Sequence, residues 1–189
     1  MKSVIAVLGL TIAAISVAGP AGAAQVTRQG TTVTVRGLIG PGDDIAFEQA
    51  APQGSYRTVV LSSPGAGEGG LPAAIAMARS IRAAGASTVV NASGSNCGSA
   101  CTLLFAAGAQ RYYVGGERIA EGVRPKGQSG LGFHQARSPR GTAQMASVYS
   151  EMGASAGADL SSKSPFETLY YVSGATALST GIATSLKRP

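Results

Sequence analysis

The sequence predicts an α/β domain with a mainly parallel central sheet. Short runs of β-branched and apolar residues alternate with segments of helical spacing, and those segments are long enough to cross back over a sheet. Hydrophobic residues make up 44% of the chain, which also contains 27 glycines. This composition is typical of a closely packed domain rather than a disordered chain. A chain of 189 residues is expected to form one domain.

The expected strands are runs of β-branched residues between turn signals. Residues 56–62 (YRTVVLS) are apolar enough to form a central strand. Residues 130–135 (GLGFHQ) are expected to be a strand or the end of one. Further strands are expected over 31–38, 88–91 and 111–114.

The expected helices are recognised by apolar spacing and by the glycines that follow them. Residues 71–84 carry Ile75, Ala78 and Ile81 at helical spacing, and Gly85 ends the segment. Residues 99–107 are expected to form a buried helix. Further helices are expected over 45–50, 141–152 and 165–172, with a linker of small residues between the last two. Irregular structure is expected over 25–30, 92–98 and 115–129.

The first residues predict a cleavable export signal. Lys2 precedes an apolar run over 4–17, which is shorter than the ~20 residues that a membrane span needs. The run Ala21-Gly-Ala is an A-x-A cleavage site, and a cut after Ala24 is an alternative. We expect a signal peptide over 1–23, one mature domain over 24–189, a periplasmic or secreted location, and no membrane span after cleavage.

The charge pattern argues against nucleic-acid binding. The formal net charge is +6, but the basic residues are scattered along the chain. Tryptophan is absent and aromatic residues make up only 5%, so neither a stacking platform nor a basic stripe is evident.

The cysteines predict a disulfide rather than a metal site. Cys97 and Cys101 are the two cysteines, and an even pair in an oxidising compartment favours a bridge over two free thiols. His134 is the single histidine, so these residues cannot complete a tetrahedral zinc site. We expect neither a metal nor a cofactor.

Three features are candidates for catalysis. Ser99 lies between a Gly/Ser turn and an apolar helix, where it is either an N-cap or a nucleophile beside helix N–H groups. The loop over 63–67 (SPGAG) follows a strand, and is either an ordinary turn or a set of N–H groups that binds an anionic oxygen. His134 is the one imidazole base available, or a structural histidine.

These segments together resemble the ClpP/crotonase-like superfamily. The run from Ser99 to Gly108 (SACTLLFAAG) is similar to the ClpP nucleophile segment, and SPG at 63–65 is similar to its oxyanion loop. Gly132-Phe-His-Gln is similar to the His-Gln segment of the family. Further similar segments lie at 37–47 and 171–182. The CxSAC pattern and the signal peptide resemble the small secreted ClpP-like proteins of the periplasm.

The resemblance implies a ClpP/crotonase fold of β-β-α and β-α-β units and a serine hydrolase, most simply a peptidase. Ser99 would be the nucleophile and His134 the general base. The oxyanion hole would be formed by N–H groups of Gly65, Ala66 and Ala100. An inactive binding domain of the same fold is the alternative. Either reading implies a peptide or protein substrate or ligand as the partner, and a homo-oligomer stays open. Acyl-CoA chemistry fits poorly, because that cofactor is not expected outside the cytoplasm.

The orienting acid is where the chain departs from the family. Leu169 stands at the position that matches the aspartate of the ClpP triad. Glu167 is the candidate substitute, Asp159 lies further upstream, and loss of the acid is the third reading. A Ser–Lys dyad with Lys126 or Lys163 is a further option, although neither surrounding sequence predicts a buried lysine.

Overall fold

The computed structural model describes residues 15–17 and 23–188. Most of the expected signal peptide, residues 1–14 and 18–22, lies outside the described residues. Within the described part, no helix has both the length and the apolar character needed to cross a bilayer.

The larger sheet is mainly parallel, as expected, and its strands follow the order β1-β2-β3-β4-β5-β7. β2 and β3 form an antiparallel hairpin, β1 pairs antiparallel with β2, and β3, β4, β5 and β7 run parallel. The strands are β1 (Ile15–Val17), β2 (Gln25–Gln29), β3 (Thr32–Arg36), β4 (Thr58–Ser62), β5 (Ser87–Asn91) and β7 (Arg111–Val114).

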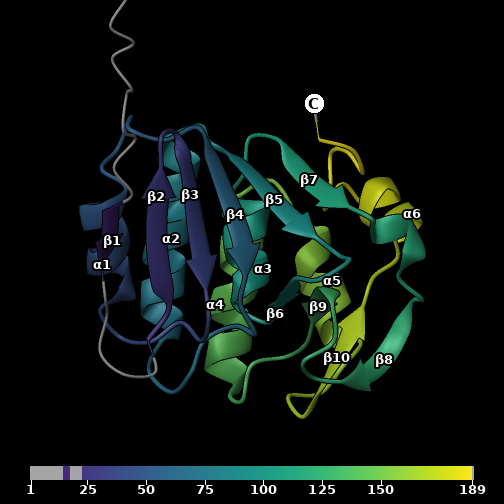
Figure 1. Cartoon of the computed structure of the whole chain (residues 1–189). Coiled ribbons are helices and arrows are strands. Elements are labelled where there is room, and N and C mark those ends of the chain that lie inside the picture. The colour runs from purple at the N-terminus through teal and green to yellow at the C-terminus, as the bar shows by residue number, and fades with distance from the viewer. Residues whose placement is uncertain (1–14, 18–22, 189) are drawn as a thin grey trace, which may run out of the picture.

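A smaller sheet of order β6-β9-β10-β8 lies beside the carboxyl end of β4 (Figure 1). β6 and β9 run parallel, while β10 is antiparallel to both β9 and β8. A bridge between Ser63 and Cys97 connects the two sheets. The strands are β6 (Asn96–Gly98), β8 (Gly122–Pro125), β9 (Gly130–Phe133) and β10 (Thr168–Tyr171).

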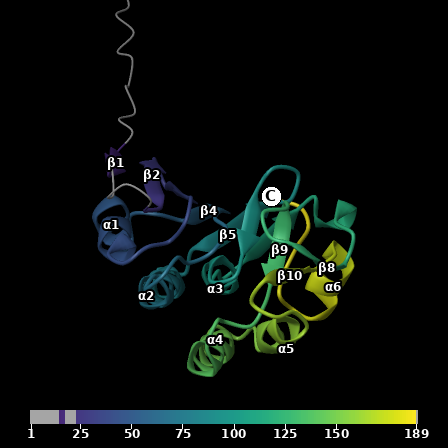
Figure 2. The ribbon, with the colours of Figure 1, turned by 90° about the horizontal axis from the view of Figure 1, so that it is seen from below.

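Helices α1, α2 and α3 line one face of the larger sheet, and α4 and α5 lie beyond α3 (Figure 2). The short helix α3 is buried at all six of its residues. The helices are α1 (Asp43–Ala50), α2 (Leu71–Ala83), α3 (Cys101–Ala106), α4 (Pro139–Glu151), α5 (Ala156–Ser162) and α6 (Gly174–Ser179), with one 3-10 turn η1 (Gly116–Arg118).

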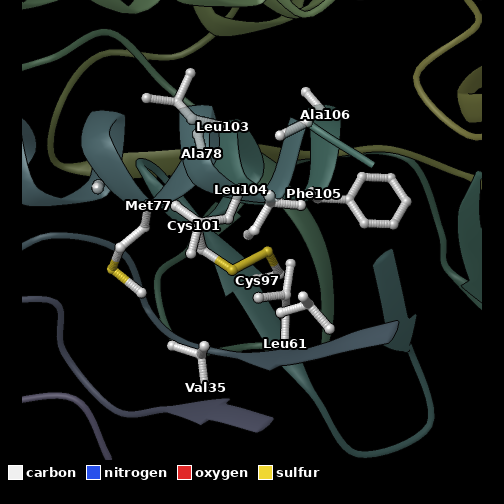
Figure 3. Packing of buried hydrophobic residues seen from close by; sticks show 14 of the residues in the cluster. Val35, Leu61, Met77, Ala78, Cys97, Cys101, Leu103, Leu104, Phe105 and Ala106 are labelled. Carbon is white, nitrogen blue, oxygen red and sulfur yellow. A yellow bond between two sulfur atoms is a disulfide. The ribbon is translucent and has the colours of Figure 1, made fainter. Parts of the chain in front are cut away.

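The core lies between α2, α3 and the larger sheet. Val35 and Leu61 come from neighbouring parallel strands, and Met77 and Leu104 come from the helices above them (Figure 3). All four side chains are at most 1% exposed. Burying side chains of this kind stabilises a fold by about 1.5–3 kcal/mol each, so this packing fixes where the carboxyl ends of the strands lie.

The prediction of a helix over 165–172 is wrong. Thr168–Tyr171 forms β10, which pairs with both β8 and β9. Threonine and tyrosine favour strands, and the pairing with two partners outweighs the local helical spacing. The segments expected to be irregular also contain regular structure: β2 lies in 25–30, β6 in 92–98, η1 and β8 in 115–129, and α5 lies in the expected linker.

Candidate active site

Ser99 sits on a strained turn between β6 and α3. Its φ is +52°, and it is the one non-glycine residue in the described part of the chain with a positive φ. Its N–H donates to the carbonyl of Gly132 in β9 at 2.9 Å. A left-handed conformation costs a non-glycine residue free energy and persists only where its surroundings hold it. Such positions gather at functional sites, so this geometry favours a nucleophile over a simple N-cap.

The carbonyl of Ser99 is fixed by the first turn of α3. It accepts a hydrogen bond from the N–H of Thr102 at 2.9 Å and a second from the hydroxyl of Thr102. That hydroxyl also hydrogen-bonds to the buried hydroxyl of Tyr149 in α4. The strained turn is therefore tied to two helices and a strand.

The expected disulfide is confirmed. Cys97 and Cys101 are bridged, with their Cα atoms 5.2 Å apart, and both side chains are fully buried. The sulfur atoms lie in the core between α3 and the larger sheet, where Met77 and Leu61 surround them (Figure 3). The bridge encloses Ser99, so it closes the turn that presents the serine.

Removing the bridge is expected to destabilise the fold by about 2 kcal/mol, because a short cross-linked loop restricts the unfolded chain. The Cys97→Ser/Cys101→Ser double variant tests this by urea denaturation. The wild-type protein measured with and without a reducing agent is the matched control. Equal free energies of unfolding in the two proteins would contradict a stabilising role for the bridge.

Gly65 brings the loop at 63–67 against the serine. A Cβ placed on Gly65 would lie 2.6 Å from the Cβ of Ser99 and 2.8 Å from the carbonyl oxygen of Gly98. The φ of Gly65 is +117°, which also disfavours a side chain. Only glycine allows the loop to approach Ser99 this closely.

Two N–H groups of the predicted oxyanion hole are available, and one is engaged. The Gly65 N–H donates to the hydroxyl of Ser63 at 3.1 Å. The N–H groups of Ala66 and Ala100 donate to no group within residues 15–17 and 23–188. Ala66, Ala100 and Ser99 line the same pocket. Ala66 and Ala100 are therefore the donors that this conformation offers to an anionic oxygen.

His134 follows β9 and is 1% exposed. Its Nδ1 lies 2.9 Å from the carbonyl oxygen of Phe166. A carbonyl only accepts hydrogen bonds, so Nδ1 carries the proton and Nε2 presents its lone pair. The buried Nε2 has no hydrogen-bond partner among the described residues, Ser99 included. This tautomer is the one that a general base needs.

The imidazole is neutral at pH 7. Burial and, to a lesser extent, the positive charge of Lys126 lower the pKa of His134 to about 4. Glu167 raises the pKa of His134 only weakly in comparison. A neutral imidazole can accept a proton, so the site holds its base in the reactive form.

Lowering the pH from 6.5 towards 4 is expected to destabilise the protein. The unfolded chain protonates His134 near a pKa of 6.5, whereas the folded chain does so only near a pKa of about 4. The unfolded state therefore binds more protons in this window, and stability falls with pH by about 2–3 kcal/mol. Urea denaturation across the window measures this loss. His134→Gln should show a shallower pH dependence, and an unchanged dependence would contradict the assignment.

No carboxylate orients the imidazole in the described residues; a backbone carbonyl does. Glu167 is exposed and makes no hydrogen bond with His134. Asp159 lies exposed on α5. Leu169 is 1% exposed and packs towards Gly98 and Gly132. The expectation that Glu167 supplies the orienting contact is therefore corrected, and the residue that sequence reasoning missed is Phe166. Because the acceptor is a backbone carbonyl, the identity of residue 166 does not predict this contact.

Neither lysine of the alternative dyad hydrogen-bonds to Ser99 within the described residues. The Nζ of Lys126 lies 3.7 Å from the ring centroid of Phe166. Lys163 donates to the hydroxyl of Tyr170 at 3.3 Å. Both lysines are exposed, so neither occupies the buried setting that a lysine base requires.

A pocket of about 360 Å³ opens beside Ser99. Its walls are mainly apolar, with Leu71 from α2, Met145 from α4 and the ring of Phe166. The Phe166 ring centroid lies 5.2 Å from that of His134. Phe166 therefore contacts both the pocket and the imidazole, and its backbone orients the base.

No protein-family model and no curated protein sequence matches the chain. Among solved structures, the chain is similar to an enoyl-CoA hydratase of Geobacillus kaustophilus HTA426, with 12% identity and a TM-score of 0.48 over 92% of this chain and 70% of that chain. It is also similar to an enoyl-CoA hydratase/carnitine racemase from Magnetospirillum magneticum, with 15% identity and a TM-score of 0.46 over 90% of this chain and 68% of that chain.

Proposed function

We propose that this protein is an exported serine hydrolase of the ClpP-like type, acting on peptide bonds with Ser99 as nucleophile and His134 as general base. The observation that carries the proposal is the strained Ser99 turn, which lines a pocket with Ala66 and Ala100, whose N–H groups have no acceptor among the described residues. The buried neutral imidazole supports it, because its Nε2 has no hydrogen-bond partner in the part of the chain that the structure describes.

The proposed reaction follows from these groups. Nε2 of His134 takes the proton of the Ser99 hydroxyl as Oγ attacks the substrate carbonyl, and the carbonyl electron pair moves onto oxygen. The N–H groups of Ala66 and Ala100 stabilise that oxyanion. The imidazolium then protonates the leaving amine, and a water molecule, deprotonated by the same imidazole, releases the acyl group from Ser99 as a carboxylic acid.

We expect the enzyme to be slow. A triad aspartate contributes about 10⁴ to turnover in serine proteases, and a neutral carbonyl stabilises the imidazolium far less than a carboxylate does. The low pKa of His134 also makes it a weak base. The apolar walls of the pocket favour a substrate with an apolar side chain next to the scissile carbonyl.

Labelling with a fluorophosphonate tests the proposal, because the reagent reacts with activated serines. Mass spectrometry of the protein over 24–189 should place the adduct on Ser99, and Ser99→Ala should abolish it. Ser179→Ala is a matched control, because Ser179 is an exposed serine of α6 that does not line the pocket. An adduct on another residue, or none at any pH between 5 and 9, would overturn the proposal.

A binding domain is the second candidate. The absence of a Ser99–His134 hydrogen bond among the described residues favours it, because a pocket can hold a peptide without a working base. Binding of peptides without any fluorophosphonate adduct would support this candidate over the hydrolase.

A further inference from the structure

Asp43 is a buried carboxylate at the start of α1. Its side chain is 1% exposed. One oxygen, Oδ2, accepts hydrogen bonds from the N–H of Ala24 at 2.9 Å and from the N–H of Gly40 at 2.7 Å. Both donors are uncharged backbone groups.

No cationic side chain neutralises this carboxylate in the described part of the chain. The salt bridge found there joins Arg79 to Glu151, and no lysine, arginine or histidine nitrogen lies within 4.0 Å of Asp43. A buried charge without an opposite charge is costly, and proteins rarely keep one. A positive charge beside Oδ2 would remove this cost.

Ala24 is the residue that can supply that charge. It is itself 1% exposed and directly precedes β2. It also directly follows the A-x-A sequence of residues 21–23. Hydrolysis of the bond between Ala23 and Ala24 adds water: the carbonyl of Ala23 becomes a carboxylate, and the nitrogen of Ala24 becomes an α-ammonium.

We propose that the chain is cut between Ala23 and Ala24, and that the new α-ammonium of Ala24 forms an ion pair with Asp43. The nitrogen already lies 2.9 Å from Oδ2, so the pair forms where the amide hydrogen bond stood. A cut after Ala24 would instead place the ammonium on Gln25, whose side chain is exposed. Of the two possible cuts, only the one before Ala24 places an α-ammonium beside Asp43.

The pair lies next to the segment that supports the loop at 63–67. Gly40, the second donor to Asp43, follows Ile39. The N–H of Ile39 donates to the carbonyl of Gly65 at 2.9 Å, and the carbonyl of Ile39 accepts from the N–H of Gly67 at 2.8 Å. Export processing would thus fix the segment that holds Gly65 against Ser99. The ion pair is independent of the proposed hydrolase function and is tested separately.

The first measurement is the mass of the exported protein. Expression of the full chain in a bacterium, followed by intact-mass analysis of the periplasmic fraction, should give the mass of residues 24–189. A mature chain that begins at any other residue, or that keeps the signal, would overturn the proposal.

The second measurement isolates the charge. Two forms of the protein are compared: one begins at Ala24, and the other carries Gly-Ser before Ala24. In the Gly-Ser form the Ala24 N–H still donates to Asp43, but the α-ammonium lies two residues away. The form that begins at Ala24 should melt about 5 °C higher at pH 7. Asp43→Asn should abolish this difference, whereas Asp44→Asn, in the same helical turn, should keep it. Equal melting temperatures of the two forms would contradict the ion pair.

The reactivity of the α-amine gives a readout that does not require the Asp43→Asn variant to fold. An ion pair that raises the pKa of the amine by one unit lowers the reactive fraction tenfold. Reductive methylation at pH 7 should therefore modify Ala24 at least about tenfold more slowly than it modifies the amine of the Gly-Ser form. Equal rates would overturn the proposal.

Discussion

Gly65→Ala is expected to lower the rate of fluorophosphonate labelling of Ser99 by about 100-fold or more. The new methyl group would lie 2.6 Å from the Cβ of Ser99, so either the serine or the loop must move. Hydrogen bonds to Ser63 and Ile39 fix the loop on both sides of Gly65, and a shift would displace the N–H of Ala66. The labelling rate, measured by intact mass against time, checks this.

Gly54→Ala is the matched control for Gly65→Ala. Gly54 also has a positive φ, +83°, but a Cβ there would meet no atom within 4 Å. Both variants bear the cost of a left-handed alanine, about 1 kcal/mol or more, yet only Gly65→Ala should lose labelling. Equal labelling rates in Gly65→Ala and the wild-type protein would show that the loop does not shape the serine site.

His134→Ala is expected to lower the labelling rate by about 10³-fold or more, while Glu167→Gln should leave it within about threefold. His134 supplies the base, and the carbonyl of Phe166 holds its Nδ1–H at 2.9 Å whether or not residue 167 is charged. Labelling rates of the two variants, measured side by side at pH 7, check this difference.

Thermal unfolding of both variants controls for loss of the fold, because His134 is buried and Glu167 is exposed. His134→Gln, which retains a polar side chain, repeats the test if the alanine variant is unstable. A loss in Glu167→Gln as large as that in His134→Ala would mean that Glu167 swings in to orient the imidazole, against the geometry described here.

The parallel half of the fold could be predicted from the sequence, and the smaller sheet could not. Strands such as β4 and β5 are apolar runs followed by turn signals, so their local sequence is sufficient. β6 has only three residues, and the spacing of residues 165–172 predicts a helix where β10 forms. Both depend on pairing with β9, a contact between segments far apart in the chain, which no local pattern encodes.

The predicted site residues differ in how well sequence could place them. The position of Ser99 between a turn and an apolar helix makes it a candidate, whereas Ala66 and Ala100 follow only from the resemblance to ClpP proteases; all three line one pocket. The engagement of the Gly65 N–H by Ser63 depends on the loop conformation and has no sequence signal. The same is true of the Phe166 carbonyl, because every residue carries one and only the fold selects which one faces the imidazole.

A crystal structure of the protein after reaction with diisopropyl fluorophosphate tests the central claim most directly. We expect phosphorus bonded to Oγ of Ser99, a phosphoryl oxygen within hydrogen-bond distance of the N–H groups of Ala66 and Ala100, and Nε2 of His134 beside the adduct. An adduct that points away from those two amides, or an imidazole that does not contact the adduct, would contradict the proposed roles of Ser99 and His134.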